Sequence, residues 1–258
     1  MDAEPVGEPP SAGADEGDAL GPLLTVHGPP SARDHLGPRA LAELERGGST
    51  SVHAVVVVGD LRMSSMILKE AVRPALFARF IVGFTEAVRA LAHASDGWFD
   101  KFTGDGFIAF WMYPPGGDPD IDTLCEFCQT VLPASDSLVQ NLRRNSRNFP
   151  TAAGLALGID SGACELVRVG GALTLVGSPV VGATRMVACA PAQDALVNLQ
   201  LGTHLEAESA RLASSGISLE RTVARTKEYP EGQEAYRLRF GLAAGERIGS
   251  GRTARSVP

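Results

Sequence analysis

The 258-residue sequence lacks an excess of positive charge, a long hydrophobic run and a basic, apolar leader. Lysine and arginine number 23 against 30 acidic residues, and the net charge of −7 argues against holding nucleic acid on a basic face. The charge-free runs are short and broken by glycine and proline, so no membrane-spanning helix is expected. The acidic, proline-rich start is the opposite of a signal peptide, and we expect a cytoplasmic protein.

Cysteine is scarce, with four residues in the chain. Cys125 and Cys128 form a CxxC pair inside a helix-like run, with no second pair and no nearby histidine. Three-residue spacing puts both thiols on one helix face, where small apolar cysteines pack. We therefore predict core packing for this pair rather than zinc binding or redox chemistry.

Apolar residues make up 44% of the chain, enough for a buried core, which excludes a wholly disordered or collagen-like chain. Residues 1–50 hold seven prolines and eight glycines and are expected to form a flexible acidic tail. Residues 241–258 have the same character. One compact domain is predicted over 51–240.

Strand-like and helix-like patterns alternate along this domain, with more strands than strict β-α alternation would give. The expected fold class is α+β, a mixed and mainly antiparallel sheet covered by helices. Strands are predicted over 51–60, 98–112 (a hairpin with Gly-Asp-Gly at its turn), 152–160, 165–170, 217–225 and 234–240. Helices are predicted over 64–92 (with a break at Pro74), 120–147, 179–189 and 204–213.

Two carboxylates lie where such strands end: Asp60 after a four-valine run and Asp105 in the hairpin turn. If the strands are neighbours, both acids project from one edge of the sheet, and a divalent cation would remove their repulsion. The alternative is that both merely cap turns. The helix start that follows Asp60, with its backbone N–H groups and hydroxyls, suits a polyphosphate.

Five segments in order resemble the motifs of class III nucleotidyl cyclase catalytic domains. They read DLRMSS, KFTGDG, GIDSG, GSPVVGATRM and KEYPEGQEAYRL, beginning at Asp60, Lys101, Gly158, Gly177 and Lys227. The resemblance covers roughly residues 51–240. It implies the ferredoxin-like α+β core of that family and a reaction that closes a nucleoside triphosphate to a 3′,5′-cyclic nucleotide and pyrophosphate.

The resemblance also implies roles for single residues. Asp60, the carbonyl of Leu61, and Asp105 would hold two divalent ions, Mg²⁺ or Mn²⁺, in each active site. Lys101 and Thr174 fall at the positions that read the base. Arg185 falls at the arginine that neutralises charge developing on the α-phosphate. The expected contacts to the ribose and triphosphate come from Arg62, Met63, Ser64, Ser65, Val181 and Lys227.

In the family these groups meet across a head-to-tail homodimer, so a monomer would be inactive. Two departures from the family pattern stand out. Val181 replaces the asparagine that normally orients the ribose, and valine has no hydrogen-bonding group. Met63, Ser64 and Ser65 replace Gly-Phe-Thr after the first metal ligand. The chain is then either a divergent cyclase or a degenerate, non-catalytic nucleotide-binding relative.

The base-reading pair does not by itself decide the substrate. Guanine needs an acceptor such as Glu, whereas Lys101 and Thr174 offer donors, which disfavours GTP. Adenine can use its N1 and N6, and uracil its O2 and O4. The short chain, Val181 and the DLRMSS loop resemble the bacterial pyrimidine cyclases of Pycsar anti-phage systems. The hypothesis is UTP cyclisation to cyclic UMP, a messenger for a separate effector, with adenylate cyclase as the alternative.

Other polar and aromatic residues are given structural roles. Asp160 is interpreted as a strand-end turn residue, and Asp96 and Asp100 as solvated, although Asp100 adjoins Lys101 and could orient it. The five histidines are scattered without metal-ligand spacing. The aromatic residues that flank the hairpin are expected to fill the core.

Overall fold

The computed structural model describes residues 19–226 and 229–241. Its helices are α1 (Gly21–His27), α2 (Ala32–Glu45), α3 (Ser64–Glu70), α4 (Pro74–Ala94), α5 (Ile121–Arg144), α6 (Ser178–Cys189), α7 (Leu199–Ala207) and α8 (Ser209–Ser214). Its strands are β1 (Ser49–Arg62), β2 (Trp98–Phe102), β3 (Gly106–Tyr113), β4 (Gly154–Val169), β5 (Ala172–Val176), β6 (Asp194–Asn198), β7 (Ile217–Ala224) and β8 (Gln233–Phe240).

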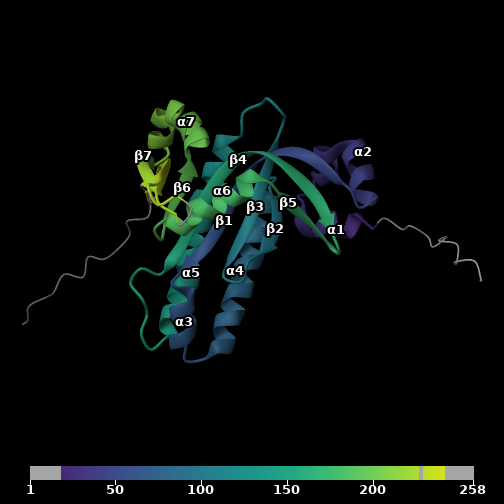
Figure 1. Cartoon of the computed structure of the whole chain (residues 1–258). Helices are drawn as coiled ribbons and strands as arrows, with labels where there is room; N and C mark the ends of the chain where they lie inside the picture. Colours follow the sequence, from purple (N-terminus) through teal and green to yellow (C-terminus); the bar gives the residue numbers. More distant parts are fainter. Residues whose placement is uncertain (1–18, 227–228, 242–258) are drawn as a thin grey trace, which may run out of the picture.

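The strands form one mixed sheet in the order β2-β3-β1-β4-β6-β8-β7, and β5 pairs with β4 beyond this path. The β4–β6 pairing is parallel and the other pairings are antiparallel. Helices lie over both faces of the sheet (Figure 1). The predicted α+β class with a mainly antiparallel sheet is therefore confirmed.

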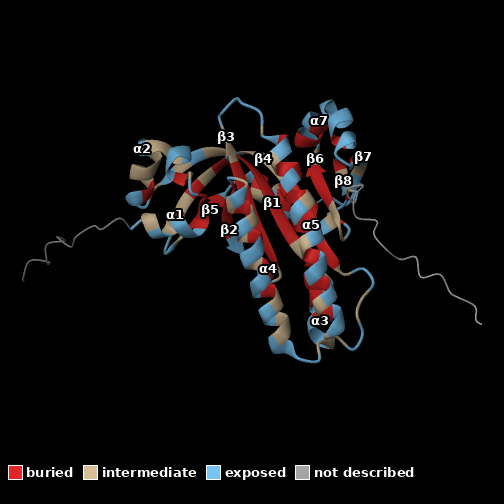
Figure 2. Ribbon diagram, turned by 180° about the vertical axis from the view of Figure 1, so that it is seen from behind, coloured by how far each residue is buried: buried red, intermediate tan, exposed pale blue. Residues whose placement is uncertain are grey.

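Alternate residues of β1 feed two hydrophobic cores, one on each face of the sheet. Val55 and Val57 pack in the core beneath α4 and α5. Val56 and Val58 pack in the second core, beneath α1, α2 and α6. Both sides of the central strands are accordingly buried (Figure 2). A run of four valines suits this position because neither face of β1 meets water.

The expectation of a flexible tail up to residue 50 is wrong for residues 19–50. Leu20, Leu24 and Leu44 are at most 5% exposed and belong to the second core. Helix α1 lies beside β2 and β5, and α2 lies beside β1, at one end of the molecule (Figure 1). Prolines and glycines lie between these leucines and disfavour helix formation. Burial of the leucines against the sheet nevertheless stabilises short helices that would not persist alone. Residues 1–18 and 242–258 lie outside the described residues.

Several predicted boundaries also change. The two strands expected over 152–160 and 165–170 are one continuous strand, β4. The helix expected over 204–213 is two helices, α7 and α8, that meet at Glu208. Strands β5 and β6 were not predicted, since five residues each give little periodic signal.

The core-packing predictions hold. Cys125 and Cys128 are buried on α5, and burial raises the pKa of both thiols, which keeps them protonated and inert. The hairpin aromatics Trp98, Phe107 and Phe110 are at most 1% exposed. Among the residues that the structure describes, no helix is both long and apolar enough to span a membrane.

Candidate functional site

The two predicted metal ligands lie next to each other at one end of β1. Strands β1 and β3 are antiparallel neighbours, and Asp60 pairs in register with Gly106, the residue after Asp105. The backbone N–H of Leu61 donates to the carbonyl of Asp105 at 3.3 Å. The Ser64 hydroxyl donates to the Asp105 carboxylate. A buried β-branched strand and a tight hairpin therefore bring together two carboxylates that are 45 positions apart.

Asp60 has one cationic and one anionic neighbour, Arg62 and Asp105. Burial raises the pKa of Asp60 above its ordinary value, Arg62 beside it lowers the pKa, and the negative charge of Asp105 raises it. Arg62 Nη1 lies 3.0 Å from Asp60 Oδ2, and Arg62 Nε donates to the Ala190 carbonyl at 3.0 Å. Arg62 is thus a counter-ion for the first carboxylate as well as a neighbour of the end of α6.

Glycine shapes the hairpin that presents Asp105. Gly104 has φ +97°, a left-handed conformation that glycine adopts without steric cost. A Cβ atom on Gly106 would lie 2.1 Å from the carbonyl oxygen of Gly59, so no side chain fits between β1 and β3 there. The Gly-Asp-Gly turn was predicted from the sequence, and this close approach gives its physical reason.

The loop between Asp60 and α3 keeps a left-handed residue. Met63 has φ 64° and ψ 17°, although a side chain at this conformation costs about 1–2 kcal/mol. It stands where the motif that this segment resembles has glycine. Ser64 is buried and Ser65 is exposed at the start of α3.

The donor set fits divalent metal ions of the Mg²⁺ or Mn²⁺ type. Carboxylate and carbonyl oxygens are the ligands these ions prefer, and one or two carboxylates completed by substrate phosphates suffice for Mg²⁺. Within residues 19–226 and 229–241, histidine, cysteine and acidic side chains form no group of three or more that could hold a metal ion. Asp60 and Asp105 with the Leu61 carbonyl therefore supply a partial shell, which a triphosphate could complete.

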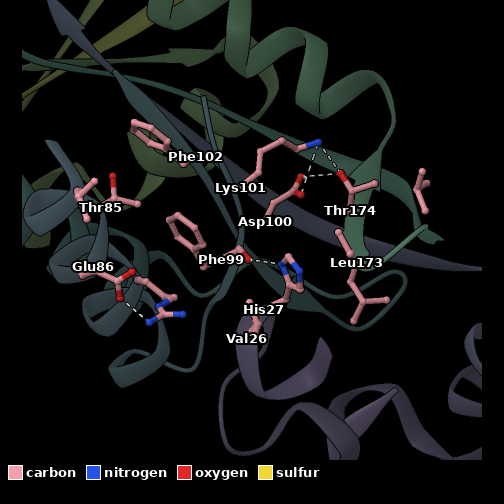
Figure 3. Close-up of a pocket in the computed structure, with 14 residues that line it drawn as sticks. Val26, His27, Thr85, Glu86, Phe99, Asp100, Lys101, Phe102, Leu173 and Thr174 are labelled. Atoms are coloured by element: carbon pink, nitrogen blue, oxygen red, sulfur yellow. Dashed lines mark hydrogen bonds and ion pairs between the residues drawn. The ribbon is translucent and has the colours of Figure 1, made fainter. Parts of the chain in front are cut away.

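The predicted base-reading residues are in direct contact. Lys101 Nζ on β2 donates to Thr174 Oγ1 on β5 at 2.6 Å (Figure 3). The two residues are 73 positions apart, and β5 reaches β2 because it folds back from β4 as a short hairpin arm. The Lys101 side chain is 47% exposed, so its ammonium group remains accessible.

Asp100 is buried, which contradicts the expectation that it is solvated. It is 2% exposed and lies at an irregularity in the β2–β3 register between Phe99 and Lys101. Burial raises the pKa of the Asp100 carboxyl, and the hydrogen bond from Thr174 and the charge of Lys101 lower it. A bulge of this kind turns a side chain away from the ladder, here toward β5, and sequence patterns do not reveal where one occurs.

A pocket of about 590 Å³ adjoins the Lys101–Thr174 pair (Figure 3). Its walls come from α1, α4, β2, β5 and the end of β4. Apolar residues such as Val26, Val82, Phe99 and Leu173 share the lining with polar and charged ones, among them Glu86 and Arg89. This volume lies in the range of small-molecule sites.

Sequence reasoning missed the contribution of α1, because residues 1–50 were expected to be a tail. His27 on α1 lines the pocket, and its Nδ1 lies 3.0 Å from the carbonyl oxygen of Phe99. Since a carbonyl only accepts, this ring nitrogen carries a proton. The spacing of Leu20 and Leu24, which are both buried, is the sequence signal that could have identified this helix.

Helix α6 carries the two remaining predicted residues. Val181 is 49% exposed, and Arg185, one helical turn later, lies 5.4 Å from the ring centre of Tyr229. A spacing of four residues puts both on one helix face. Arg185 is thus positioned by a cation–π contact, and Val181 offers an apolar surface beside it.

Asp160 is a partly buried acid beneath α6, in the middle of β4 rather than in a strand-end turn as expected. Ser161 N–H donates to its Oδ1 at 2.7 Å, and the Asn198 amide donates to the same oxygen. Burial raises its pKa to about 6, against the hydrogen bonds, which lower it. A Cβ atom on Gly182 would lie 1.7 Å from Asp160 Oδ2, so α6 sits directly on this carboxyl group.

The chain thus brings the predicted residues together in three groups: the acids at the end of β1, the Lys101–Thr174 pair, and the face of α6 with Arg185. Among the described hydrogen bonds and ion pairs, none joins Arg185 to either of the other groups. Lys227, the predicted triphosphate contact, lies outside the described residues.

Comparison with solved structures identifies the fold. The adenylyl cyclase CyaB from P. aeruginosa superposes with a TM-score of 0.60 at 18% identity, covering 78% of this chain and 99% of that one. The guanylyl cyclase Cya2 gives 0.58 at 14% identity, covering 77% and 97%. The guanylate cyclase domain of RhGC from Catenaria anguillulae, in complex with GTP, gives 0.54 at 14% identity, covering 73% and 97%.

No family model and no curated protein matches the sequence. At these identities the structural similarity establishes the fold alone: the chain has the fold of class III adenylyl and guanylyl cyclase domains. Its chemistry has to be argued from its own residues.

Proposed function

We propose that the chain is a nucleotidyl cyclase, which converts a nucleoside triphosphate into a 3′,5′-cyclic nucleotide and pyrophosphate. The observation that carries this is the adjacency of Asp60 and Asp105 at the end of β1, with the Lys101–Thr174 contact on the same sheet. Two carboxylates close together at a sheet edge repel each other, and a degenerate, non-catalytic module has no need to keep both.

Each group of residues has one task in this reaction. Asp60, the Leu61 carbonyl and Asp105 would hold two divalent ions, which lower the pKa of the substrate 3′-hydroxyl and bind the triphosphate. Lys101 and Thr174 orient the base. The 3′-oxygen attacks the α-phosphorus as its proton passes to solvent water, and the bond from the α-phosphorus to the bridging oxygen of the β-phosphate breaks to release pyrophosphate. Arg185 neutralises the charge that develops on the α-phosphate.

The three groups need a second copy of the chain to form one site. We propose a head-to-tail homodimer in which the acids of one protomer face Lys101, Thr174 and Arg185 of the other. Mixing Asp60→Ala protein with Arg185→Ala protein then restores part of the activity, because one of the two sites in a mixed dimer is intact. No restoration, with mixed dimers confirmed by mass, would refute composite sites.

The proposed substrate is UTP and the product cyclic UMP, which would act on a separate effector protein in defence against phage; ATP is the second candidate. Support comes from the exposed Val181, which cannot hold the ribose by a hydrogen bond, and from the altered loop at Met63. Both depart from the family pattern in the direction of the pyrimidine cyclases.

One assay tests both the cyclase reaction and the choice of UTP as substrate. Purified protein is incubated with equal amounts of ATP, CTP, GTP and UTP and with Mn²⁺, and pyrophosphate and cyclic nucleotides are measured. Asp60→Ala and Asp105→Ala serve as inactive controls whose fold is checked by thermal unfolding. Absence of pyrophosphate from all four nucleotides would refute the cyclase. Cyclic AMP as the main product would refute only the choice of UTP.

A further inference from the structure

Asp100 lies directly behind the base-reading pair without belonging to it. The register between β2 and β3 shifts at this residue, and its side chain turns toward β5 (Figure 3). The residue is 2% exposed, and its Oδ1 has no hydrogen-bond partner among the described residues. A carboxylate this deeply buried requires donors, and the donors available here are those of the base-reading pair and its strand.

The donors and acceptors around Thr174 follow from which groups carry protons. Lys101 Nζ has only protons to offer, so it donates to Thr174 Oγ1 at 2.6 Å. With Asp100 ionised, Thr174 Oγ1 in turn donates to Asp100 Oδ2 at 3.2 Å. The N–H of Leu175 donates to the same Asp100 oxygen at 3.3 Å, and Lys101 Nζ lies 3.6 Å from Asp100 Oδ1.

A hydroxyl group has one proton and two lone pairs. At Thr174 the proton is directed at Asp100 and one lone pair at Lys101, which leaves one lone pair for a ligand. We infer that Asp100 is a positioning residue that fixes Thr174 as a hydrogen-bond acceptor, so that the base-reading pair presents one donor, Lys101, beside one acceptor, Thr174. This inference rests on the proposed function, because it assumes that a nucleobase enters the pocket.

The hydrogen bond to Asp100 changes which uracil atom Thr174 can contact. The sequence alone allowed Thr174 to donate to a uracil oxygen, but in the structure its proton is used in the hydrogen bond to Asp100. Uracil is then read through O4, which accepts from Lys101, and through N3–H, which donates to Thr174. Adenine matches through N1 and its N6 amino group, and cytosine through N3 and its N4 amino group. Guanine matches through O6 and N1–H but leaves its N2 amino group without an acceptor of this pair.

Two replacements at Asp100 separate its hydrogen bond from its charge. Asp100→Asn retains one oxygen for Thr174 and Leu175 and removes the charge beside Lys101. Asp100→Leu has a similar shape and removes the acceptor, so the Thr174 hydroxyl is free to rotate and to donate. Asp194→Leu is the matched control, because Asp194 is an acid on the same sheet whose side chain is 17% exposed and which is not among the residues that line the pocket.

The readout is the dissociation constant of four α,β-methylene triphosphate analogues, measured by calorimetry with Mg²⁺: those of UTP and ATP, and the same two with the donor methylated at N3 of uracil or dimethylated at N6 of adenine. Methylation removes the N–H that donates to Thr174, so the base ratio, the affinity of each unmodified analogue over its methylated form, reports on the Thr174 acceptor. We expect Asp100→Leu to reduce this ratio about tenfold, the equivalent of one hydrogen bond. Asp100→Asn keeps the ratio of the wild type. In a Thr174→Val background, Asp100→Leu leaves the ratio unchanged, because Asp100 acts through Thr174.

The outcomes distinguish this inference from the proposed function. An unchanged base ratio in Asp100→Leu overturns the role of Asp100 and leaves the cyclase standing. An equal loss of affinity for all four analogues, matched by Asp194→Leu, overturns it as well, because it would indicate support of the fold only. Analogue binding with the expected ratios but no pyrophosphate release refutes the cyclase and retains the role of Asp100. Binding of none of the analogues by the wild type overturns both.

Discussion

Asp160 lies beneath the helix that carries Arg185, and its charge should destabilise the folded protein at neutral pH. Burial raises its pKa from an ordinary 3.8 to about 6. At 1.36 kcal/mol per pH unit, this difference corresponds to about 3 kcal/mol of unfavourable free energy once the group is ionised. Asp160→Asn removes the charge and keeps an oxygen for Ser161 and Asn198. Its new amide N–H₂ faces Gly182 without a partner, so the expected net stabilisation at pH 7.5 is about 1–2 kcal/mol.

The stability of the wild type should fall as Asp160 ionises with rising pH. Because folding raises the pKa of Asp160, the folded protein binds more protons than the unfolded chain between pH 3.8 and about 6. The free energy of unfolding of the wild type therefore falls as the pH rises through this window, and the loss is complete above it. Asparagine does not titrate. The gain in stability of Asp160→Asn over the wild type should accordingly grow between pH 4 and 6 and remain constant at higher pH.

Urea unfolding at pH 4.0, 5.0, 6.0 and 7.5, followed by tryptophan fluorescence, measures this difference. Trp98 is fully buried and reports on the core. Asp118→Asn is the control for the loss of an exposed carboxylate, since the Asp118 side chain is 86% exposed. A stability difference that is the same at all four pH values, or an Asp160→Asn variant less stable than the wild type at pH 7.5, would refute the reasoning.

Three further replacements test other parts of the structure. Met63→Gly should stabilise the fold by about 1 kcal/mol in urea unfolding, because glycine adopts the left-handed conformation without steric cost; destabilisation would mean that the Met63 side chain contributes packing. Arg185→Ala should lower kcat by an amount equivalent to about 2–4 kcal/mol, and a loss confined to KM would contradict its place at the transition state. Leu44→Ala should cost about 2–5 kcal/mol, since Leu44 is fully buried on α2; no change would mean that the segment before the sheet does not belong to the fold.

The sequence by itself determined the central part of the fold and the first half of the site. A four-valine strand, a Gly-Asp-Gly hairpin and two amphipathic helices are local patterns, and each forms where its own residues favour it. The sequence left open whether Asp60 and Asp105 merely cap turns. With β1 and the hairpin as neighbours, their adjacency follows from where the strands end. The Lys101–Thr174 contact was expected only through the resemblance to a family, because no local pattern links residues 73 positions apart.

The tertiary structure decided which polar groups are buried and which segment closes the pocket. Asp100 is buried because of a register shift in β2, and Asp160 is partly buried because α6 packs on it through Gly182. Helix α1 becomes a pocket wall because Leu20 and Leu24 fit the second core, although the residues around them resemble a tail. Burial depends on the atoms that arrive from distant parts of the chain. Neighbours in sequence therefore determine whether a residue lies in a helix or a strand, whereas its pKa and its hydrogen-bond partners depend on how the sheet and helices pack.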